Sequence, residues 1–182
     1  RSFGNGDVIV AASGHTFPIW PHCVSDEARA QNMTKGIRIH RTGGPEVLVY
    51  EEFEVAPPGE GQALVRNTAI GLNFIDTYHR SGLYPLPLPS GIGLEAAAVV
   101  EAVGKGVKHV RPGDRVGYAG PPPGAYAERR LIPAQRLVKL PDSISDRQAA
   151  AMLLKGLTVQ YLIRRVHRVQ AGETVLFHAA AG

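Results

Sequence analysis

Residues 93–116 read GLEAAAVVEAVGKGVKHVRPGDRV, and the first half of this stretch decides the class of fold. The β-branched pair Val99–Val100 lies in an apolar run bounded by glycines, which predicts a strand over residues 94–104 despite its alanines. The sequence RPGDRV then provides a Pro-Gly turn that leads into another short strand. Short strands separated by such turns indicate a β-rich domain.

The same pattern continues on both sides of this stretch. We predict further strands over residues 36–40, 47–55 and 62–72, and within residues 111–120, 124–133 and 136–144. The sequence NFIDTYHRSG, residues 73–82, predicts a short helix closed by Gly82. The proline-rich residues 84–93 suit neither a helix nor a central strand. Together these elements predict a β-barrel or sandwich-like domain.

The pattern becomes helical near Ser145. Ser145 and Gln148 have the spacing of a capping box, and alanine-rich helix follows until Gly156. In LTVQYLIRRVHRV, residues 157–169, four apolar residues recur at helical spacing and predict a second helix. A second domain is therefore expected to begin at residue 145.

The last residues, TVLFHAAAG (174–182), predict a strand that runs into small residues and Gly182. A dinucleotide-binding βαβ unit opens in this way, because its glycines let the backbone approach a pyrophosphate. By itself this stretch is weak evidence for nucleotide binding.

The composition narrows the function classes. The chain has 182 residues, 44% hydrophobic and 20% charged, with a net charge of +4, which is typical of a soluble globular protein. The basic run at residues 164–168 is interpreted as a solvated helix face rather than a nucleic-acid contact. Cys23 is the single cysteine, so neither an intrachain disulfide nor a four-cysteine zinc site is possible. No apolar run approaches the roughly 20 residues of a membrane span, and we expect a cytoplasmic protein.

The first residues differ from the rest. The first methionine is Met33, and residues 1–32 lack a sustained period. We therefore expect Met33 to be the true start and residues 1–35 to be an extension outside the fold. The spacing of His15, His22 and Cys23 matches no standard zinc pattern, so we interpret them as incidental polar residues.

Four motifs, taken in order, resemble one family. They are AIGLNFIDTYHRSGLYP (69–85), residues 93–116, KGLTVQYL (155–162) and VLFHAAAG (175–182). This combination resembles the zinc-independent quinone oxidoreductases of the medium-chain dehydrogenase/reductase superfamily, which are similar to zeta-crystallin. The resemblance covers about residues 36–182.

The resemblance implies a mainly β GroES-like barrel domain over residues 36–144, followed by the truncated start of an α/β Rossmann domain over residues 145–182. In this family NADPH and the substrate occupy the cleft between the two domains. The implied reaction is NADPH-dependent reduction of quinones or other electron-poor small molecules, without nucleic-acid or membrane partners, by a homodimer when full-length. The family's glycine loop continues after "AAAG", so we expect this chain to be an N-terminal fragment that is inactive alone.

The resemblance also bears on metal chemistry. Zinc-dependent relatives place a cysteine and a histidine where Asn73 and Leu94 stand here. Neither residue is a tight zinc ligand, and Tyr118–Glu128 has no cysteine for a structural zinc loop. We therefore expect no metal. Alkoxide chemistry commonly uses a metal, whereas a quinone or enone needs only hydrogen-bond donors near its oxygen.

By resemblance, the catalytic residues are Tyr84 and Asn73, and the cofactor-binding residues are Asn73, Phe74, Tyr78, Thr158 and Gly182. Plainer interpretations stay open. Asn73 can be a helix N-cap, Tyr78 a core residue with its hydroxyl at the edge, and Thr158 a simple helix-start residue. Phe74 and Tyr78 share a face if this helix forms, with Asp76 turned away and paired to Arg80. No role is assigned to Glu95, and His178 is not expected to be catalytic.

Two other functions are compatible with these residues. One is an enone or alkenal reductase of the same superfamily, and the other is a non-catalytic GroES-like interaction module. Intact stretches NFIDTY and KGLT argue against the module, because a pure scaffold has no need of polar groups that face a cofactor.

Overall fold

A computed structural model describes residues 32–178, and the alanine-rich stretch forms a strand, β5 (Glu95–Val103), whose first four residues are all buried. Ala96 and Ala98 face the barrel interior, whereas Ala97 packs against Ala149 and Ala150 of the helix α3 (Asp146–Tyr161). A strand covered on both faces is apolar at successive positions rather than alternating. This double burial explains why an alanine-rich run is a strand here, as predicted.

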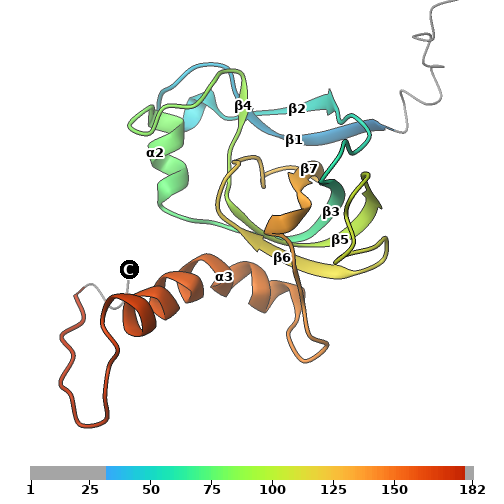
Figure 1. Cartoon of the computed structure of the whole chain (residues 1–182). Helices are drawn as coiled ribbons and strands as arrows, with labels where there is room; N and C mark the ends of the chain where they lie inside the picture. Colours follow the sequence, from blue (N-terminus) through green and yellow to red (C-terminus); the bar gives the residue numbers. More distant parts are fainter. Residues whose placement is uncertain (1–31, 179–182) are drawn as a thin grey trace, which may run out of the picture.

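Two antiparallel sheets make up the β-domain (Figure 1). The larger has the order β7-β3-β5-β6-β8 and the smaller the order β2-β1-β4. The remaining strands are β1 (Met33–Ile39), β2 (Val49–Glu54), β3 (Gln62–Gly71), β4 (Ser90–Gly91), β6 (Arg115–Ala119), β7 (Arg129–Pro133) and β8 (Val138–Lys139). A bridge between Gly36 and Ala127 and the hydrogen bond from Ile37 N to the Tyr126 carbonyl join the sheets.

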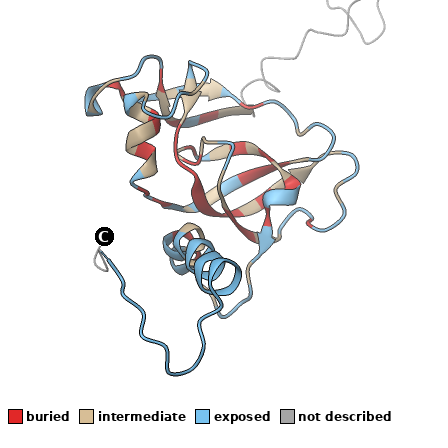
Figure 2. Ribbon diagram, turned by 60° about the vertical axis from the view of Figure 1, so that its left-hand side comes forward, coloured by how far each residue is buried: buried red, intermediate tan, exposed pale blue. Residues whose placement is uncertain are grey.

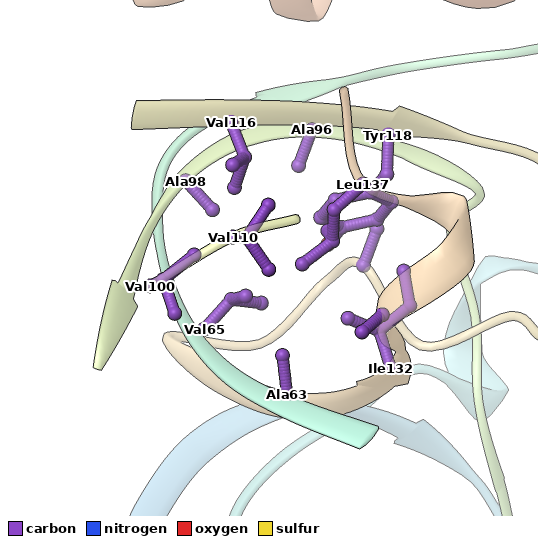
Figure 3. Packing of buried hydrophobic residues seen from close by; sticks show 12 residues of the cluster. Ala63, Val65, Ala96, Ala98, Val100, Val110, Val116, Tyr118, Ile132 and Leu137 are labelled. Atoms are coloured by element: carbon purple, nitrogen blue, oxygen red, sulfur yellow. The ribbon is translucent and has the colours of Figure 1, made fainter. Parts of the chain in front are cut away.

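The core lies inside the curved five-stranded sheet. Val65, Val100, Val116, Tyr118 and Ile132 are each at most 1% exposed and point toward one another (Figure 3). Their side chains come from β3, β5, β6 and β7, so the barrel interior is filled by residues distant in sequence. A small separate cluster of Ile39, Val47 and Ile92 lies under the three-stranded sheet.

Several predicted boundaries shift. β1 begins at Met33, so the boundary predicted at residue 36 lies inside a strand, and Thr34 accepts a hydrogen bond from Arg129 N. The strand predicted over residues 47–55 begins later, as β2 at Val49. Pro45 favours the start of a turn, and the 3₁₀ turn η1 (Pro45–Val47) takes up the first predicted strand residue. The strand expected within residues 136–144 shortens to β8, after the 3₁₀ turn η2 (Ala134–Arg136).

The helix α3 packs on the larger sheet, whereas the second helix, α2 (Ile75–Ser81), lies beside the β1–β2 connection, where Gly43 N donates to the Arg80 carbonyl. The short helix α2 ends at Gly82, whose φ of 86° is the left-handed conformation that suits glycine, as predicted. The capping box of Ser145 and Gln148 starts α3, also as predicted. Only the side of α3 that faces the sheet is covered, and the rest is exposed (Figure 2).

The two-helix prediction for residues 145–169 is wrong. Gly156 lies within α3, which runs on to Tyr161 and ends in the π-helical turn η3 (Leu162–Val166). One glycine costs a helix only about 1 kcal/mol, which the neighbouring helix formers offset. The strand predicted at Thr174–Phe177 is also not formed, because no described strand lies beside it to complete a ladder. This segment is exposed throughout (Figure 2).

Candidate functional site

Asn73 lies in the turn between β3 and α2, with 8% of its surface exposed. Its Nδ2 donates to Glu95 Oε2 at 2.7 Å. The predicted alternative of a helix N-cap is wrong: Phe74 occupies the N-cap position, and no side chain caps there. Instead Asp76 Oδ2 accepts from the Asn73 backbone N–H at 3.1 Å, which leaves the Asn73 carboxamide available to the site.

Glu95 is the fully buried acid of this site. Its Oε2 accepts from Asn73, and its Oε1 accepts from Leu154 N of α3 at 2.7 Å. A buried carboxylate is costly unless hydrogen bonds compensate for lost water, and these bonds supply that compensation. Glu95, whose role the sequence left open, therefore connects β5 to the β3–α2 turn and to α3.

Lys155 completes the arrangement and was missed from the sequence. Its Nζ donates to Asn73 Oδ1 at 3.0 Å and lies 3.9 Å from Glu95 Oε2. The rest of its side chain is exposed, 60% in all. Its sequence neighbourhood, KGLT, was already part of the family resemblance, but nothing local indicates contact with residue 73.

Three aromatic rings follow Asn73 in the chain, one at the start of α2, one within it and one in the loop after it. Phe74 packs edge-to-face on Tyr78 with centroids 5.3 Å apart, which confirms that these residues share a face. Tyr78 packs in the same way on Tyr84, also at 5.3 Å, and Tyr84 N donates to the Tyr78 carbonyl. Phe74 is 74% exposed and Tyr84 47%, so this aromatic cluster offers an open apolar wall with hydroxyl groups at its edge.

Asp76 and Tyr126 line a pocket of about 220 Å³ that also includes Phe74, the first ring of this wall. Tyr126 Oη donates to Asp76 Oδ2 at 2.8 Å, and burial, with the nearby carboxylate, raises the pKa of Tyr126 above its ordinary value. The predicted Asp76–Arg80 pair is not formed, since the Asp76 carboxylate turns instead to Tyr126 and the Asn73 backbone. Leu72, Asn73 and Phe74 line the same pocket.

The remaining predicted site residues lie elsewhere. Thr158 is inside α3 rather than at a helix start, and its exposed hydroxyl donates to the Leu154 carbonyl at 3.0 Å. The helix continues through Gly156, so the Leu154 carbonyl, four residues before Thr158, lies within reach of this hydroxyl and accepts its hydrogen bond. Gly182 lies outside the described residues, as do His15, His22 and Cys23. His178 is exposed.

Within residues 32–178, no three His, Cys, Asp or Glu side chains are grouped so that they could hold a metal ion. Leu94 is buried and apolar. Over the same residues, no helix is both long and apolar enough to cross a bilayer.

Comparison with known proteins agrees with this fold. Residues 59–142 match the family model described as the alcohol dehydrogenase GroES-like domain. These residues include the β3–α2 turn, Glu95 and the aromatic cluster, so the matched domain carries most of the site, while Lys155 lies beyond it.

The chain is 57% identical over 151 residues to a quinone oxidoreductase of Pseudomonas aeruginosa, covering 82% of this chain and 46% of that protein. It is 51% identical over 151 residues to a 2-haloacrylate reductase of a Burkholderia species, covering 79% and 45%. The crystal structure of Escherichia coli quinone oxidoreductase complexed with NADPH is 54% identical, with a TM-score of 0.73, covering 75% of this chain and 42% of that one.

The chain thus spans about half the length of the curated relatives it matches. The matched half is the one in which strands β3 and β5, the β3–α2 turn and the start of α3 meet. On these matches, the chain belongs to the quinone oxidoreductases of the medium-chain dehydrogenase/reductase superfamily and carries their GroES-like domain.

Proposed function

We propose that this chain is the substrate-side part of an NADPH-dependent quinone reductase that works without zinc. The observation that carries the proposal is the position of the Asn73 carboxamide, held by hydrogen bonds beside the exposed wall of Phe74, Tyr78 and Tyr84. The quinone oxidoreductase relatives, one of them bound to NADPH, support the same reading.

The residues at the site fit a nicotinamide cofactor on one side. Phe74 and the edge of Tyr78 offer an apolar surface suited to a flat ring, and the Asn73 carboxamide offers polar contacts. The cofactor, when bound, supplies a hydride to the substrate. Thr158 and Gly182 remain proposed cofactor contacts by resemblance alone.

The chain's own contribution is to stabilise the charge that develops on the substrate oxygen. A quinone that accepts a hydride becomes a hydroquinone anion, whose oxygen then takes a proton. Fixed N–H and O–H donors lower the free energy of that oxyanion without reorganising when charge appears. Asn73 and the Tyr84 hydroxyl are the donors we assign, and neither requires a metal ion.

A second candidate is reduction of a conjugated acid or enone. The 51% identity to a 2-haloacrylate reductase favours it, since hydride addition to a conjugated double bond also leaves an oxyanion to be stabilised. The same donors serve both reactions, so the substrate is decided by the shape of the pocket rather than by the chemistry.

The experiment uses the full-length enzyme. By this we mean a polypeptide in which this chain is followed by a second half like the one that its relatives have. We expect NADPH-dependent quinone reduction that persists in chelator, and slower reduction of 2-haloacrylates. Tyr84→Phe should lower kcat for quinone by about 100-fold with little change in the KM for NADPH, because one donor to the oxyanion is lost. Tyr50→Phe, a change at an exposed tyrosine of β2, is the control.

Three results would contradict the proposal. Reduction of haloacrylates in clear preference to quinones would favour the second candidate. Activity lost with a tightly held zinc ion would remove the metal-free mechanism. Unchanged turnover of Tyr84→Phe with several quinones would leave Tyr84 as a packing residue.

A further inference from the structure

The partners of Asn73 permit one orientation of its carboxamide. A carboxylate only accepts hydrogen bonds and an ammonium group only donates them. Glu95 Oε2 lies 2.7 Å from Nδ2, and Lys155 Nζ lies 3.0 Å from Oδ1. Turning the amide by 180° would place its oxygen against the carboxylate and its NH₂ group against the ammonium, so both contacts would become repulsive.

This orientation leaves one donor unused. The Asn73 amide nitrogen carries two hydrogens, and Glu95 takes one of them. The second N–H belongs to a residue that lines the pocket of about 220 Å³ next to Leu72 and Phe74. A flipped amide would instead present the carbonyl oxygen, which repels a developing oxyanion.

We infer that Lys155 is a positioning residue for quinone reduction, which acts by locking the Asn73 carboxamide with an N–H directed to the substrate. The inference rests on the proposed function of Asn73. Lys155 and the partner of Glu95, Leu154, are neighbours in α3, so the placement of this helix sets both contacts.

The helix is held at this place by close packing. Ala149 and Ala150 pack on Ala97 of β5, and a Cβ at Gly71 would lie 2.6 Å from Glu95 Oε2. The Lys155 ammonium also lies near the otherwise buried negative charge of Glu95. Its positive charge therefore has two neighbours in the site, the Asn73 oxygen and the Glu95 carboxylate, while its stem is exposed to solvent.

The first test is a double-mutant cycle in the full-length enzyme with Lys155→Met, Asn73→Ala and the double variant. Lys155→Met should lower kcat for quinone about 10-fold with little change in the KM for quinone. In the Asn73→Ala background it should cause no further loss, because the lysine acts through that amide. Lys155→Arg, which keeps the donors, should recover most of the activity.

Lys105→Met is the matched control, since Lys105 is exposed in the turn that follows β5, at the end of that strand opposite to Glu95. It should leave kcat unchanged. An equal loss from Lys155→Met in both backgrounds would overturn the inference, because the lysine would then act independently of Asn73. No loss in either background would overturn it as well.

The second test measures the amide directly in this chain of 182 residues. In spectra of asparagine labelled with ¹⁵N, the Asn73 side-chain pair, assigned through Asn73→Ala, should show one strongly shifted proton and slow exchange. Lys155→Met should narrow the difference between the two protons and speed exchange, and Lys105→Met should not.

The two tests separate the two claims. A wild-type full-length enzyme that reduces no quinone would refute the proposed function, whereas the amide spectrum decides by itself whether Lys155 holds Asn73. If Lys155→Met leaves the two side-chain amide proton signals of Asn73 unchanged, the inference that Lys155 fixes this amide is refuted, even if the enzyme is active.

Discussion

Gly71 shows how one residue sets the distance between β3 and α3. A Cβ at this position would overlap the Ala150 carbonyl oxygen and lie 2.6 Å from Glu95 Oε2. Both neighbours are held in place, one in a helix backbone and the other by two hydrogen bonds. Hydrogen at this position therefore lets α3 approach closely enough for Leu154 and Lys155 to reach the site.

We predict opposite effects of alanine at two glycines. Gly71→Ala should lower the free energy of unfolding by about 3 kcal/mol, because neither backbone nor buried carboxylate can yield cheaply. Gly156→Ala, inside α3 with no atom within 4 Å of its added Cβ, should raise stability by up to about 1 kcal/mol. Urea unfolding followed by circular dichroism measures both, and a neutral Gly71→Ala would contradict the close packing.

At the scale of elements, α3 is anchored at its beginning and free at its end. Ser145 and Gln148 cap its first turn, and Ala149 and Ala150 pack on β5. Arg115 of β6 donates from Nε and Nη2 to Asp146 Oδ1, at 3.1 and 2.6 Å, and from Nη2 to the Ile144 carbonyl. These contacts, rather than helix propensity, dock the first turns on the sheet.

Asp146 gives this docking a dependence on pH. The nearby Thr68 hydroxyl and then the Arg115 guanidinium hold the pKa of Asp146 below its ordinary value of 3.8. A lowered carboxyl pKa stabilises the fold fully above the ordinary value, and this stabilisation is lost as pH falls through the folded value.

We therefore predict that Asp146→Asn lowers the free energy of unfolding by about 1–2 kcal/mol, equally at pH 7 and pH 5. The difference from wild type should shrink as the pH falls below 3.8. Asp142→Asn, at an exposed residue just before the helix, is the control and should have little effect at any pH. A penalty for Asp146→Asn that persists unchanged at pH 3 would show that its charge is not the cause.

At the scale of the molecule, one part of the chain has its own core and the other does not. The barrel interior is closed by β3, β5, β6 and β7, whereas Leu157, Tyr161 and Val166 are more than half exposed (Figures 2 and 3). Residues 167–178 form an open loop that turns back beside the end of α3, without strand or helix (Figure 1).

We predict that hydrogen exchange separates these two parts. Amides of β3, β5 and β6 should be the slowest to exchange, since opening them requires unfolding of the barrel. Amides of residues 162–178 should exchange fastest, and the first turns of α3 should lie between. Protection of residues 174–177 equal to that of β5 would contradict this order.

Local patterns could be predicted from the sequence because their physics is local. The glycine-bounded run around Val99–Val100, the capping box at Ser145, the glycine end at Gly82 and the shared face of Phe74 and Tyr78 each depend on residues a few positions apart. The family resemblance rests on the same kind of evidence, and it led to Asn73 and the aromatic cluster.

The contacts between Asn73, Glu95 and Lys155 could be decided only by the tertiary structure. Their residues lie 22 and 82 positions from Asn73, and they meet because β3, β5 and α3 pack together. The errors at Gly156 and Thr174–Phe177 have the same origin. Local propensity predicts a helix break at a glycine and a strand at a β-branched run. The surrounding residues decide whether the helix continues and whether the strand has a partner for its backbone hydrogen bonds. The sequence alone thus determined most of the elements and the family, whereas long-range packing decided where α3 ends, whether the last strand forms and which side chains form the site.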